Sequence, residues 1–496
     1  MTDGAGQVTY EYDALNRLNS VTRGTDAFAY TYDADGNLKT RKYPDGTQTT
    51  YAYDDANRLS SMTVGSATTS FGYDPANYLT STTLPNGVVS SQTIDAAGRV
   101  TKVVNAKGTT TYSSFDATLD AVGNPTKIVT PTETATYTYD KVNRLTKVCY
   151  TATCAGQALS GIEYSYDGVG NRVTETRYGS TSSTTSHYYG GDQPSTKTFP
   201  DGRDWVTFTF NDKNWNQTSA SDTGTFTYDL EGRIMSATVG NKKESYTYDG
   251  DGNRLTLSAN GKVTTKYLWD PLPDPNVSAL ALERTSSNGL LRRYIYGPGA
   301  ASTPISMTTG GSDHYYLTDA LGSVANVTSS TGANEWSYTY EPFGALRSAT
   351  SGRQAPTNLI RFTGQLFDAT TGYYDLRARE YDPINGRFLQ PDPLAPPFRD
   401  PAISPYIYAN DGPTVLADPS GMGAEGPQAS STPEATPQLA PSLSSFECLT
   451  IFTLSGTATF VTFVLPFFIA VPFSVLVVGG VVGVVSILAG IKAGCI

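Results

Sequence analysis

Histidine and cysteine, which often act as nucleophiles, bases or metal ligands, are scarce in this chain of 496 residues. The two histidines, His187 and His314, are far apart in the sequence, and no local motif accompanies either one. A zinc site would rest mainly on cysteines and carboxylates, and a Ser-His-Asp triad would have to use one of these histidines. The sequence therefore predicts no metal site and no cofactor.

Two of the four cysteines lie close together. Cys149 and Cys154 bracket four residues, a spacing that can close a small disulfide loop on a hairpin. Two free thiols in a loop are an equally acceptable interpretation at this stage. A disulfide would indicate an oxidising compartment. The other two, Cys448 and Cys495, lie in an apolar C-terminal segment and indicate no chemistry.

The composition favours β-structure and argues against nucleic acid as a partner. The formal net charge is −11, and an acidic chain does not attract phosphate backbones. Charged residues make up only 16%, whereas the chain has 33 tyrosines and 47 glycines. Aromatic residues favour strands and glycines favour turns.

A tyrosine–aspartate pattern repeats along the first half of the chain. Its first copy is Tyr10-Glu-Tyr-Asp13-Ala-Leu-Asn-Arg17-Leu. Aspartates recur every 20 or 21 residues at positions 13, 33, 54, 74 and 95. Later copies centre on Asp140, Asp167, Asp229, Asp249 and Asp270. The period is that of a repeat architecture rather than of several ordinary domains.

Each copy has the features of a β-hairpin. The rings of Tyr-x-Tyr are two residues apart and share one face of a strand. Aspartate can bond its own backbone two residues on, and the following Gly or Asn tolerates the left-handed conformation that ends a three-residue hairpin loop. One hairpin cannot bury its aromatic face alone, so neighbouring hairpins must form one twisted sheet. A flexible Ser/Thr/Gly-rich chain would not keep this aromatic phase.

This unit resembles the YD repeat of RHS proteins, of bacterial toxin-complex C components and of teneurins. The resemblance implies an all-β fold of tandem β-hairpin repeats that form a spiral, curved shell around a hollow interior, which in that family often holds a toxin. We expect this shell to occupy residues 1–310. We also expect a hydrophobic helical tail at the C-terminus.

A second resemblance covers residues 311–422, which match the RHS repeat-associated core. The matching motifs, in order, are Asp319-Ala-Leu-Gly-Ser-Val, Tyr340-Glu-Pro-Phe-Gly, Arg361-Phe-Thr-Gly-Gln, Arg379-Glu-Tyr-Asp-Pro, Gly386-Arg-Phe-Leu-Gln-Pro-Asp-Pro and Asp418-Pro-Ser-Gly-Met. Such an order of motifs is very improbable by chance.

In that family the core is an aspartyl autoprotease that cuts once, just after the closing Asp-Pro-x-Gly element. The resemblance implies that Asp392 and Asp418 are the two acids and that Arg379 supports them. The bond to be cut would join Met422 and Gly423, with Met in place of the usual Leu. Such an enzyme turns over once and has no external substrate.

Two neighbouring carboxylates suit this reaction because they cannot both ionise easily, so one stays protonated while the other activates water. A guanidinium could orient the pair. Asp392 and Asp418 are distant in sequence, so only tertiary folding can join them. The alternative is that both Asp-Pro pairs only open turns. The family's glycine-rich stretch after the first Asp-Pro is replaced here by residues 394–398, which places the site geometry in question.

The C-terminal part changes character abruptly. Residues 423–445 hold four prolines and many small residues, as a flexible linker does. Residues 446–496 are hydrophobic, with no charge between 448 and 491, and the block 473–491 has nearly the length that spans a bilayer. We expect residues 448–491 to enter a membrane; a soluble pair of strands is the alternative. In the family this is the position of the variable toxic payload.

Three functional interpretations follow. The first is an RHS-type polymorphic toxin, or a fragment of one, whose core releases a membrane-active tail, with an immunity protein as partner. The second is a secreted or cell-surface protein, anchored by its tail, whose aromatic ladders contact carbohydrate or another cell. The third is an inactive relic. The N-terminus shows no secretory signal, so export would use another route or the chain would be a piece of a longer protein.

Overall fold

The computed structural model of the chain describes residues 2–3, 6–155, 159–199, 206–210, 212–272, 277–298, 303–393, 403–424, 426, 477–478 and 481–482. The chain divides into two compact units, residues 1–440 and 441–496. Each is described by itself.

The first unit is dominated by one sheet of 33 strands in which each strand pairs with the next in antiparallel fashion. Its first part comprises β1 (Thr2–Asp3), β2 (Gly6–Tyr12), β3 (Leu18–Arg23), β4 (Asp26–Tyr32), β5 (Leu38–Lys42), β6 (Gln48–Tyr53), β7 (Leu59–Val64), β8 (Ala67–Tyr73), β9 (Leu79–Thr83), β10 (Val89–Ile94), β11 (Val100–Lys107), β12 (Thr110–Leu119), β13 (Pro125–Val129), β14 (Thr134–Tyr139), β15 (Leu145–Cys149), β16 (Gly161–Tyr166), β17 (Arg172–Tyr178) and β18 (Ser183–Gly190). It continues as β19 (Gln193–Thr198), β20 (Val206–Thr209), β21 (Ser219–Ala220), β22 (Gly224–Tyr228), β23 (Ile234–Val239), β24 (Lys242–Tyr248), β25 (Arg254–Ala259), β26 (Lys262–Asp270), β27 (Ala279–Arg284), β28 (Leu290–Ile295), β29 (Ser306–Thr309), β30 (Ser312–Thr318), β31 (Val324–Ser329), β32 (Asn334–Tyr340) and β33 (Leu346–Ser351). The all-β hairpin array predicted from the sequence is confirmed.

The hairpin turn of the first repeat has the predicted geometry. The amide of Leu15 donates to Oδ1 of Asp13, and the same oxygen accepts from the amide of Arg17. Asn16 adopts a left-handed conformation with φ of 59°, as the loop requires. The strand pairing shifts by one residue at Tyr12, which is the bulge that accompanies this loop. The sequence of one turn therefore fixes the register of its own hairpin.

Neighbouring hairpins are locked together by the tyrosine and arginine of the repeat. Tyr166 donates its hydroxyl to the carbonyl of Leu145, one hairpin earlier, over 2.7 Å. Arg144 pairs with Asp140 in its own turn and donates to the carbonyl of Asp167 in the next turn over 2.8 Å. The guanidinium of Arg144 also lies over the Tyr166 ring. These contacts explain why Tyr, Asp and Arg recur together.

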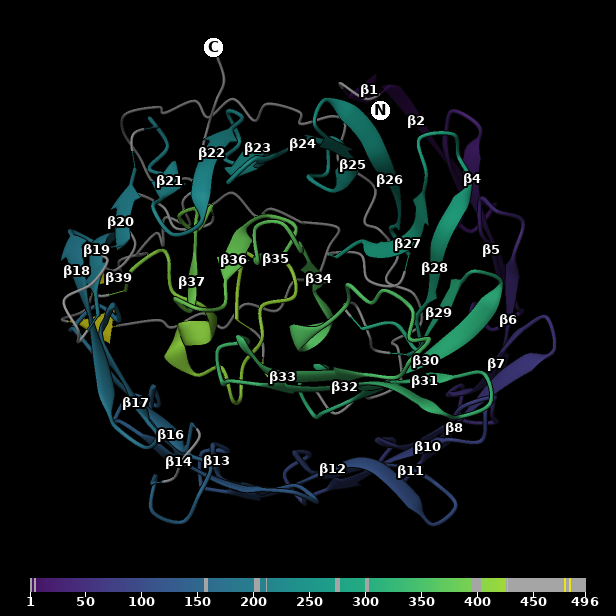
Figure 1. The fold of residues 1–496 in the computed structure, drawn as a ribbon. Helices are drawn as coiled ribbons and strands as arrows, with labels where there is room; N and C mark the ends of the chain where they lie inside the picture. Colours follow the sequence, from purple (N-terminus) through teal and green to yellow (C-terminus); the bar gives the residue numbers. More distant parts are fainter. Residues whose placement is uncertain are drawn as a thin grey trace. The chain divides into compact units, whose positions relative to one another are not determined.

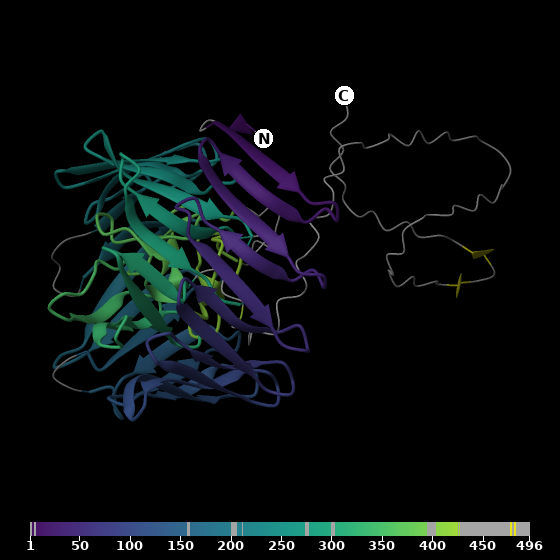
Figure 2. The ribbon, with the colours of Figure 1, turned by 90° about the vertical axis from the view of Figure 1, so that its right-hand side faces the viewer.

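The sheet curls so that its later strands lie inside its earlier ones. In Figure 1, β27 to β33 run along the inner side of the wall formed by β4 to β12, and Figure 2 shows the successive tilted strands of that wall from the side. Ion pairs join the two layers: Arg293 contacts Asp45 at 2.8 Å, and Arg347 contacts Glu133 at 2.8 Å. The twist of the strands is the physical cause of this curvature.

A small four-stranded sheet occupies the interior of the curled sheet. It consists of β34 (Leu366–Phe367), β35 (Tyr374–Asp375), β36 (Glu380–Asp382) and β37 (Arg387–Phe388), flanked by the 3-10 turns η1 (Phe362–Gly364) and η2 (Ala409–Asp411). The aromatic rings of this inner sheet share a hydrophobic core with wall strands β15 and β16. Tyr381 and Tyr408 are completely buried there.

In the second unit the structure describes β38 (Val477–Val478) and β39 (Val481–Val482), which pair with each other. The predicted helical, membrane-entering tail otherwise lies outside the described residues, as does most of the linker 423–445. Within the described part of the chain, no helix has the length and apolar character needed to cross a bilayer.

Candidate functional site

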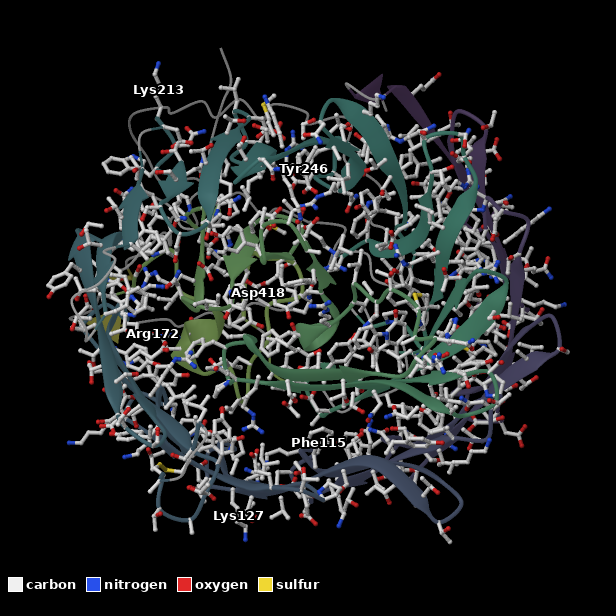
Figure 3. The ribbon with its side chains drawn as sticks, viewed as in Figure 1. Phe115, Lys127, Arg172, Lys213, Tyr246 and Asp418 are labelled. Atoms are coloured by element: carbon white, nitrogen blue, oxygen red, sulfur yellow. A yellow bond between two sulfur atoms is a disulfide. The ribbon has the colours of Figure 1, made fainter. Side chains whose placement is uncertain are left out.

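The candidate site forms where a turn of the inner sheet meets the closing Asp-Pro-Ser-Gly-Met segment. The turn, residues 376–379, joins β35 to β36, and the amide of Leu376 donates to the carbonyl of Arg379 to close it. The closing segment, residues 418–423, follows η2 and is called the cleavage loop below. Figure 3 shows Asp418 inside the space enclosed by the strands, with Arg172 and Tyr246 belonging to the surrounding wall.

The structure brings together the three residues that the sequence places at the site. Nη2 of Arg379 lies 3.1 Å from Oδ2 of Asp418 and 4.0 Å from Oδ2 of Asp392. The amide of Asp392 donates to the carbonyl of Pro405, and Nη1 of Arg379 donates to the same oxygen. The guanidinium is also packed against the ring of Phe388. Arg379 is thus held between the two carboxylates.

Asp418 contacts the bond that the sequence marks for cleavage. Its Oδ1 atom accepts hydrogen bonds from the amides of Met422 and Gly423, each over 3.1 Å. The hydroxyl of Ser420 lies 3.5 Å from the same oxygen and accepts from the Met422 amide. The nitrogen of the Met422–Gly423 bond therefore lies within hydrogen-bonding distance of a carboxyl group.

The two acids are in different surroundings. The Asp418 side chain is 2% exposed, whereas that of Asp392 is 26% exposed. Burial raises the pKa of Asp418 above its usual range, although the charge of Arg379 and the amides of the cleavage loop oppose this shift. Burial likewise lowers the pKa of Arg379, and the two aspartates oppose that shift. Burial therefore favours the protonated form of Asp418.

The turn grips three successive carbonyl groups of the cleavage loop. Arg377 donates from Nη1 to the carbonyl of Pro419 over 2.5 Å, and the amide of Ala378 donates to the carbonyl of Ser420 over 3.2 Å. Nε of Arg379 donates to the carbonyl of Gly421. Gly421 has a φ of +71°, and a Cβ there would collide with the carbonyl oxygen of Leu376. Glycine at this position is what allows the loop to lie so close to the turn.

A cavity of about 620 Å³ opens beside the cleavage loop. Ser420, Met422 and Pro393 line it on one side. The other side is formed by shell residues from two distant repeats, among them Tyr12 and Arg233. Met422 is 36% exposed, so the residue before the candidate scissile bond is within reach of water.

Sequence reasoning did not find Arg377, Ser420 or Gly421 as parts of the site. The only signal was local: Arg377 and Arg379 are two apart, and Ser420 and Gly421 lie within the closing motif. Residues 394–398, which replace the family's glycine-rich stretch, lie outside the described residues. Among the described residues no group of His, Cys, Asp and Glu is arranged to hold a metal ion.

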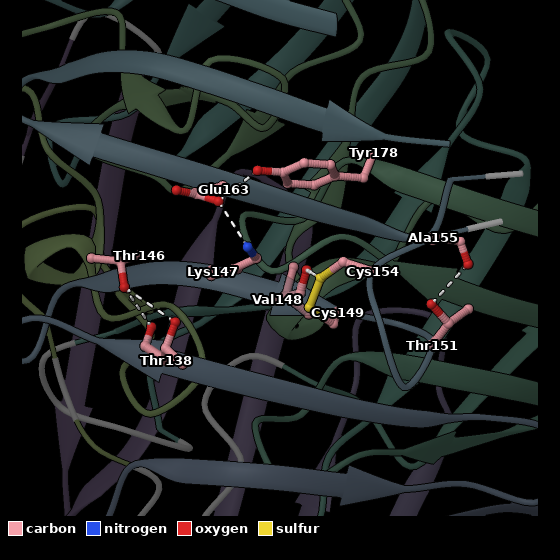
Figure 4. Close-up of a disulfide and its surroundings, with 10 residues drawn as sticks. All are labelled: Thr138, Thr146, Lys147, Val148, Cys149, Thr151, Cys154, Ala155, Glu163 and Tyr178. Atoms are coloured by element: carbon pink, nitrogen blue, oxygen red, sulfur yellow. Dashed lines mark hydrogen bonds and ion pairs between the residues drawn. A yellow bond between two sulfur atoms is a disulfide. The ribbon is translucent and has the colours of Figure 1, made fainter. Parts of the chain in front are cut away.

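Cys149 and Cys154 form a disulfide in the structure (Figure 4), with their Cα atoms 4.8 Å apart. The bond closes the short loop that follows β15. Thr151 donates to the carbonyl of Ala155 across the same loop. This pair is far from the cleavage loop in sequence and has no contact with Arg379, Asp392 or Asp418 among the described interactions.

The curled hairpin sheet with an inner aromatic sheet defines a class of β-shell proteins. The Teneurin YD-shell family model matches residues 2–191 and 279–408, which is more than half of the chain. The chain therefore belongs to the Teneurin YD-shell family.

Curated relatives carry toxin and nuclease names. The chain is 30% identical over 295 residues to the tRNA3(Ser)-specific nuclease WapA of Bacillus spizizenii, covering 57% of this chain and 12% of that protein. It is 32% identical over 108 residues to the toxin protein Tse5 of Pseudomonas aeruginosa, covering 22% of this chain and 8% of that protein. The chain thus spans only a small part of these relatives.

Among solved structures, the TcdB2-TccC3-TEV crystal structure is similar, with a TM-score of 0.63 at 18% identity. The match covers 84% of this chain and 24% of that one. At this identity the likeness establishes the shell fold alone. The recognition of an RHS/YD-repeat protein from the sequence is confirmed by these comparisons together.

Proposed function

We propose that this chain is a polymorphic-toxin shell, or a piece of one, whose core cuts its own backbone once between Met422 and Gly423. The observation that carries the proposal is the position of Asp418. It accepts hydrogen bonds from the amide of this bond, that of Gly423, and from the preceding amide of Met422, and it contacts the arginine that also faces Asp392. Toxin-named relatives support the toxin class.

The geometry supports a division of labour between the acids. The more exposed Asp392, as carboxylate, takes a proton from a water molecule that enters from the cavity, and the hydroxide adds to the carbonyl carbon of Met422. The protonated Asp418 gives its proton to the Gly423 nitrogen as that atom loses its planar amide geometry. The products are a carboxylic acid on Met422 and an amine on Gly423, which exchange a proton to give a carboxylate and an ammonium group. One water is consumed for one bond broken, and Asp392 is left protonated and Asp418 ionised. Arg379 keeps both carboxyl groups in place.

Mass spectrometry of the full-length chain tests this proposal. Wild type is expected to yield a fragment that begins Gly423-Ala-Glu and ends at Ile496. Asp392→Asn and Asp418→Asn should each keep the chain whole, because either change removes one proton-transfer group. Asp74→Asn is the matched control, since Asp74 lies in a hairpin turn of the shell and has no contact with the cleavage loop. An intact wild-type chain would refute autoproteolysis.

The released segment 423–496 is proposed to act on membranes through residues 448–491, with an immunity protein as its partner in the producing cell. Its composition supports this assignment: it has no histidine, and its hydrophobic part holds Glu447 as its only acid. Secretion or display at the cell surface fits the disulfide in the shell. No nucleic acid partner is proposed, because the chain is acidic.

Producing the full chain in a bacterial host separates this proposal from its alternative. Growth arrest with loss of membrane potential, seen with wild type and absent with Asp418→Asn, is the expected result for a toxin released by cleavage. The alternative is a membrane-anchored surface protein for adhesion or carbohydrate contact. It is favoured by harmless residence of the uncleaved chain in the membrane fraction.

A further inference from the structure

Arg377 contacts the shell and the cleavage loop at the same time. Its Nε atom donates to the carbonyl of Ser278 over 3.0 Å, just before β27 of the shell. Its Nη1 atom donates to Pro419 of the cleavage loop and to Oε1 of Gln365. The guanidinium also faces the ring of Trp269 on β26 at 5.7 Å. One planar side chain therefore joins a shell residue that lies 99 positions before it in the chain to a loop residue that lies 42 positions after it.

The backbone of Arg377 is itself held in an unusual conformation. Its φ is +65°, in the left-handed region that a residue with a Cβ rarely adopts. The amide of Arg377 donates to Oδ1 of Asp375 over 2.7 Å, which supports this conformation. Such a conformation costs free energy and persists only where its surroundings enforce it. The turn is therefore shaped by its contacts rather than by local preference.

The ends of the same turn are also tied to the shell. Arg254 on β25, which is 3% exposed, pairs with Asp375 at 3.1 Å and with Glu380 at 2.6 Å. These two carboxylates lie immediately before and after residues 376–379. The contact with Glu380 is a hydrogen bond between charged groups and is therefore directional, whereas the contact with Asp375 is an ion pair. Shell strands β25 to β27 thus fix both the ends and the middle of the turn.

We propose that Arg377 is a positioning residue that makes backbone cleavage depend on docking of the inner sheet against shell strands β25 to β27. The inference rests on the proposed autocleavage and adds its regulation. Arg377 touches neither Asp392 nor Asp418 within the described contacts. It acts through the carbonyl of Pro419, next to Asp418, so it sets where the cleavage loop lies relative to Arg379. An incompletely formed shell would leave the loop unaligned and the bond uncut.

The test compares cleavage rates of full-length variants, each produced and purified in denaturant so that it is still uncut and then refolded to start the reaction. Arg377→Met, which keeps the length and apolar part of the side chain, should cut about 10- to 100-fold more slowly, as misplacement of a reacting group by about 1 Å does. Its pH profile should keep the wild-type shape, because the proton-transfer groups are unchanged. Arg377→Lys, able to donate to Pro419 but not to all three acceptors, should be intermediate.

Arg58→Met is the matched control. Arg58 also donates to a backbone carbonyl, that of Asp74, pairs with Asp54 and lies over the ring of Tyr73, and these contacts are in the hairpins of β6 to β9, away from β25 to β27. This variant should cleave at the wild-type rate. Rates are compared per folded molecule, with folding measured by protease resistance of the shell.

A second measurement separates positioning from general weakening. In an Asp392→Asn background, which stays whole, hydrogen exchange at the Met422 and Gly423 amides should speed up on Arg377→Met while strands β2 to β12 stay protected. Equal cleavage by Arg377→Met and wild type would overturn the inference, as would an altered pH profile or unchanged exchange at these amides. If wild type itself stays whole, the proposed function fails instead.

Discussion

The amide of Gly423 donates a hydrogen bond of 3.1 Å to the Oδ1 atom of Asp418. This places a buried carboxyl group on the nitrogen that would become the new N-terminus after cleavage. The contact does not follow from the turn geometry of an Asp-Pro pair alone, because it depends on Gly421 letting the loop fold back on the turn at residues 376–379.

The rate of cleavage should fall as the pH rises. Burial raises the pKa of Asp418, and the proposed reaction uses its protonated form. That form is present below the raised pKa and is lost as the pH passes through it, so the rate should decline on the alkaline side of the usual carboxyl range of about 4. The measurement is the first-order rate of fragment formation in a series of buffers from about pH 4 to 9. A rate that rises with pH across this series would contradict the assignment.

Gly421→Ala should greatly slow cleavage and should destabilise the core by about 1–3 kcal/mol. The new Cβ would meet the carbonyl of Leu376 and would force a left-handed residue out of its conformation. Gly46→Ala is the control: Gly46 also has a positive φ of 87°, but a Cβ there meets nothing within 4 Å. Both variants carry backbone strain, but only Gly421→Ala also collides with the turn at residues 376–379. Only this variant should therefore lose the cleaved fragment. Urea unfolding midpoints and fragment yield provide the comparison.

Tyr166→Phe should lower the free energy of unfolding by about 1 kcal/mol, because it removes the hydrogen bond to Leu145 that joins two hairpins. Arg144→Met should cost about 1–2 kcal/mol, since it removes the ion pair to Asp140 and the bond to the next turn. Tyr188→Phe changes a ring that is 52% exposed and should have no measurable effect. Equal changes in the free energy of unfolding for all three substitutions would show that the contacts of Tyr166 and Arg144 between hairpins contribute nothing to stability.

Asp319→Asn should stabilise the shell above about pH 6 and have little effect near pH 4. Burial raises the pKa of Asp319 to about 6. The folded state therefore favours the protonated acid, and stability is lost as the pH rises through the folded pKa. The stabilisation at pH 8 should reach roughly 2–3 kcal/mol, by the free-energy equivalent of the shift. Asparagine can still accept from the Leu321 and Ser323 amides through Oδ1.

Asp95→Asn should change the stability of the fold in the opposite direction and serves as the comparison for Asp319→Asn. Hydrogen bonds from the side chain and backbone of Arg99 lower the pKa of Asp95, so its ionised form stabilises the fold above its usual pKa. The substitution should therefore destabilise at neutral pH and still do so at pH 4, losing its effect only as the pH falls through the lowered pKa of Asp95. At pH 8 the melting temperature should be higher than that of wild type for Asp319→Asn and lower for Asp95→Asn. A common direction would mean that the shifts are wrongly assigned.

The hairpins could be predicted from the sequence because their determining contacts are local. Asp13 bonds to amides two and four residues on, and Asn16 closes the same loop, so one short segment specifies one turn and its register. The period of 20 or 21 residues then implies a continuous sheet, since the aromatic face of one hairpin needs the next. The acids and the arginine of the candidate site were found by motif, not by geometry.

The relative positions of the site residues depend on the tertiary structure and could not be predicted from the motif. Arg379 lies between Asp392 and Asp418, and Arg377 joins Ser278 to Pro419, only because the sheet curls and encloses the inner strands. That curvature sums small twists over 33 strands, and no local segment encodes the sum. Contacts within four residues are thus fixed by the sequence of each repeat, whereas the contacts of the site, such as that between Arg377 and Ser278 across 99 residues, depend on how the whole sheet curls.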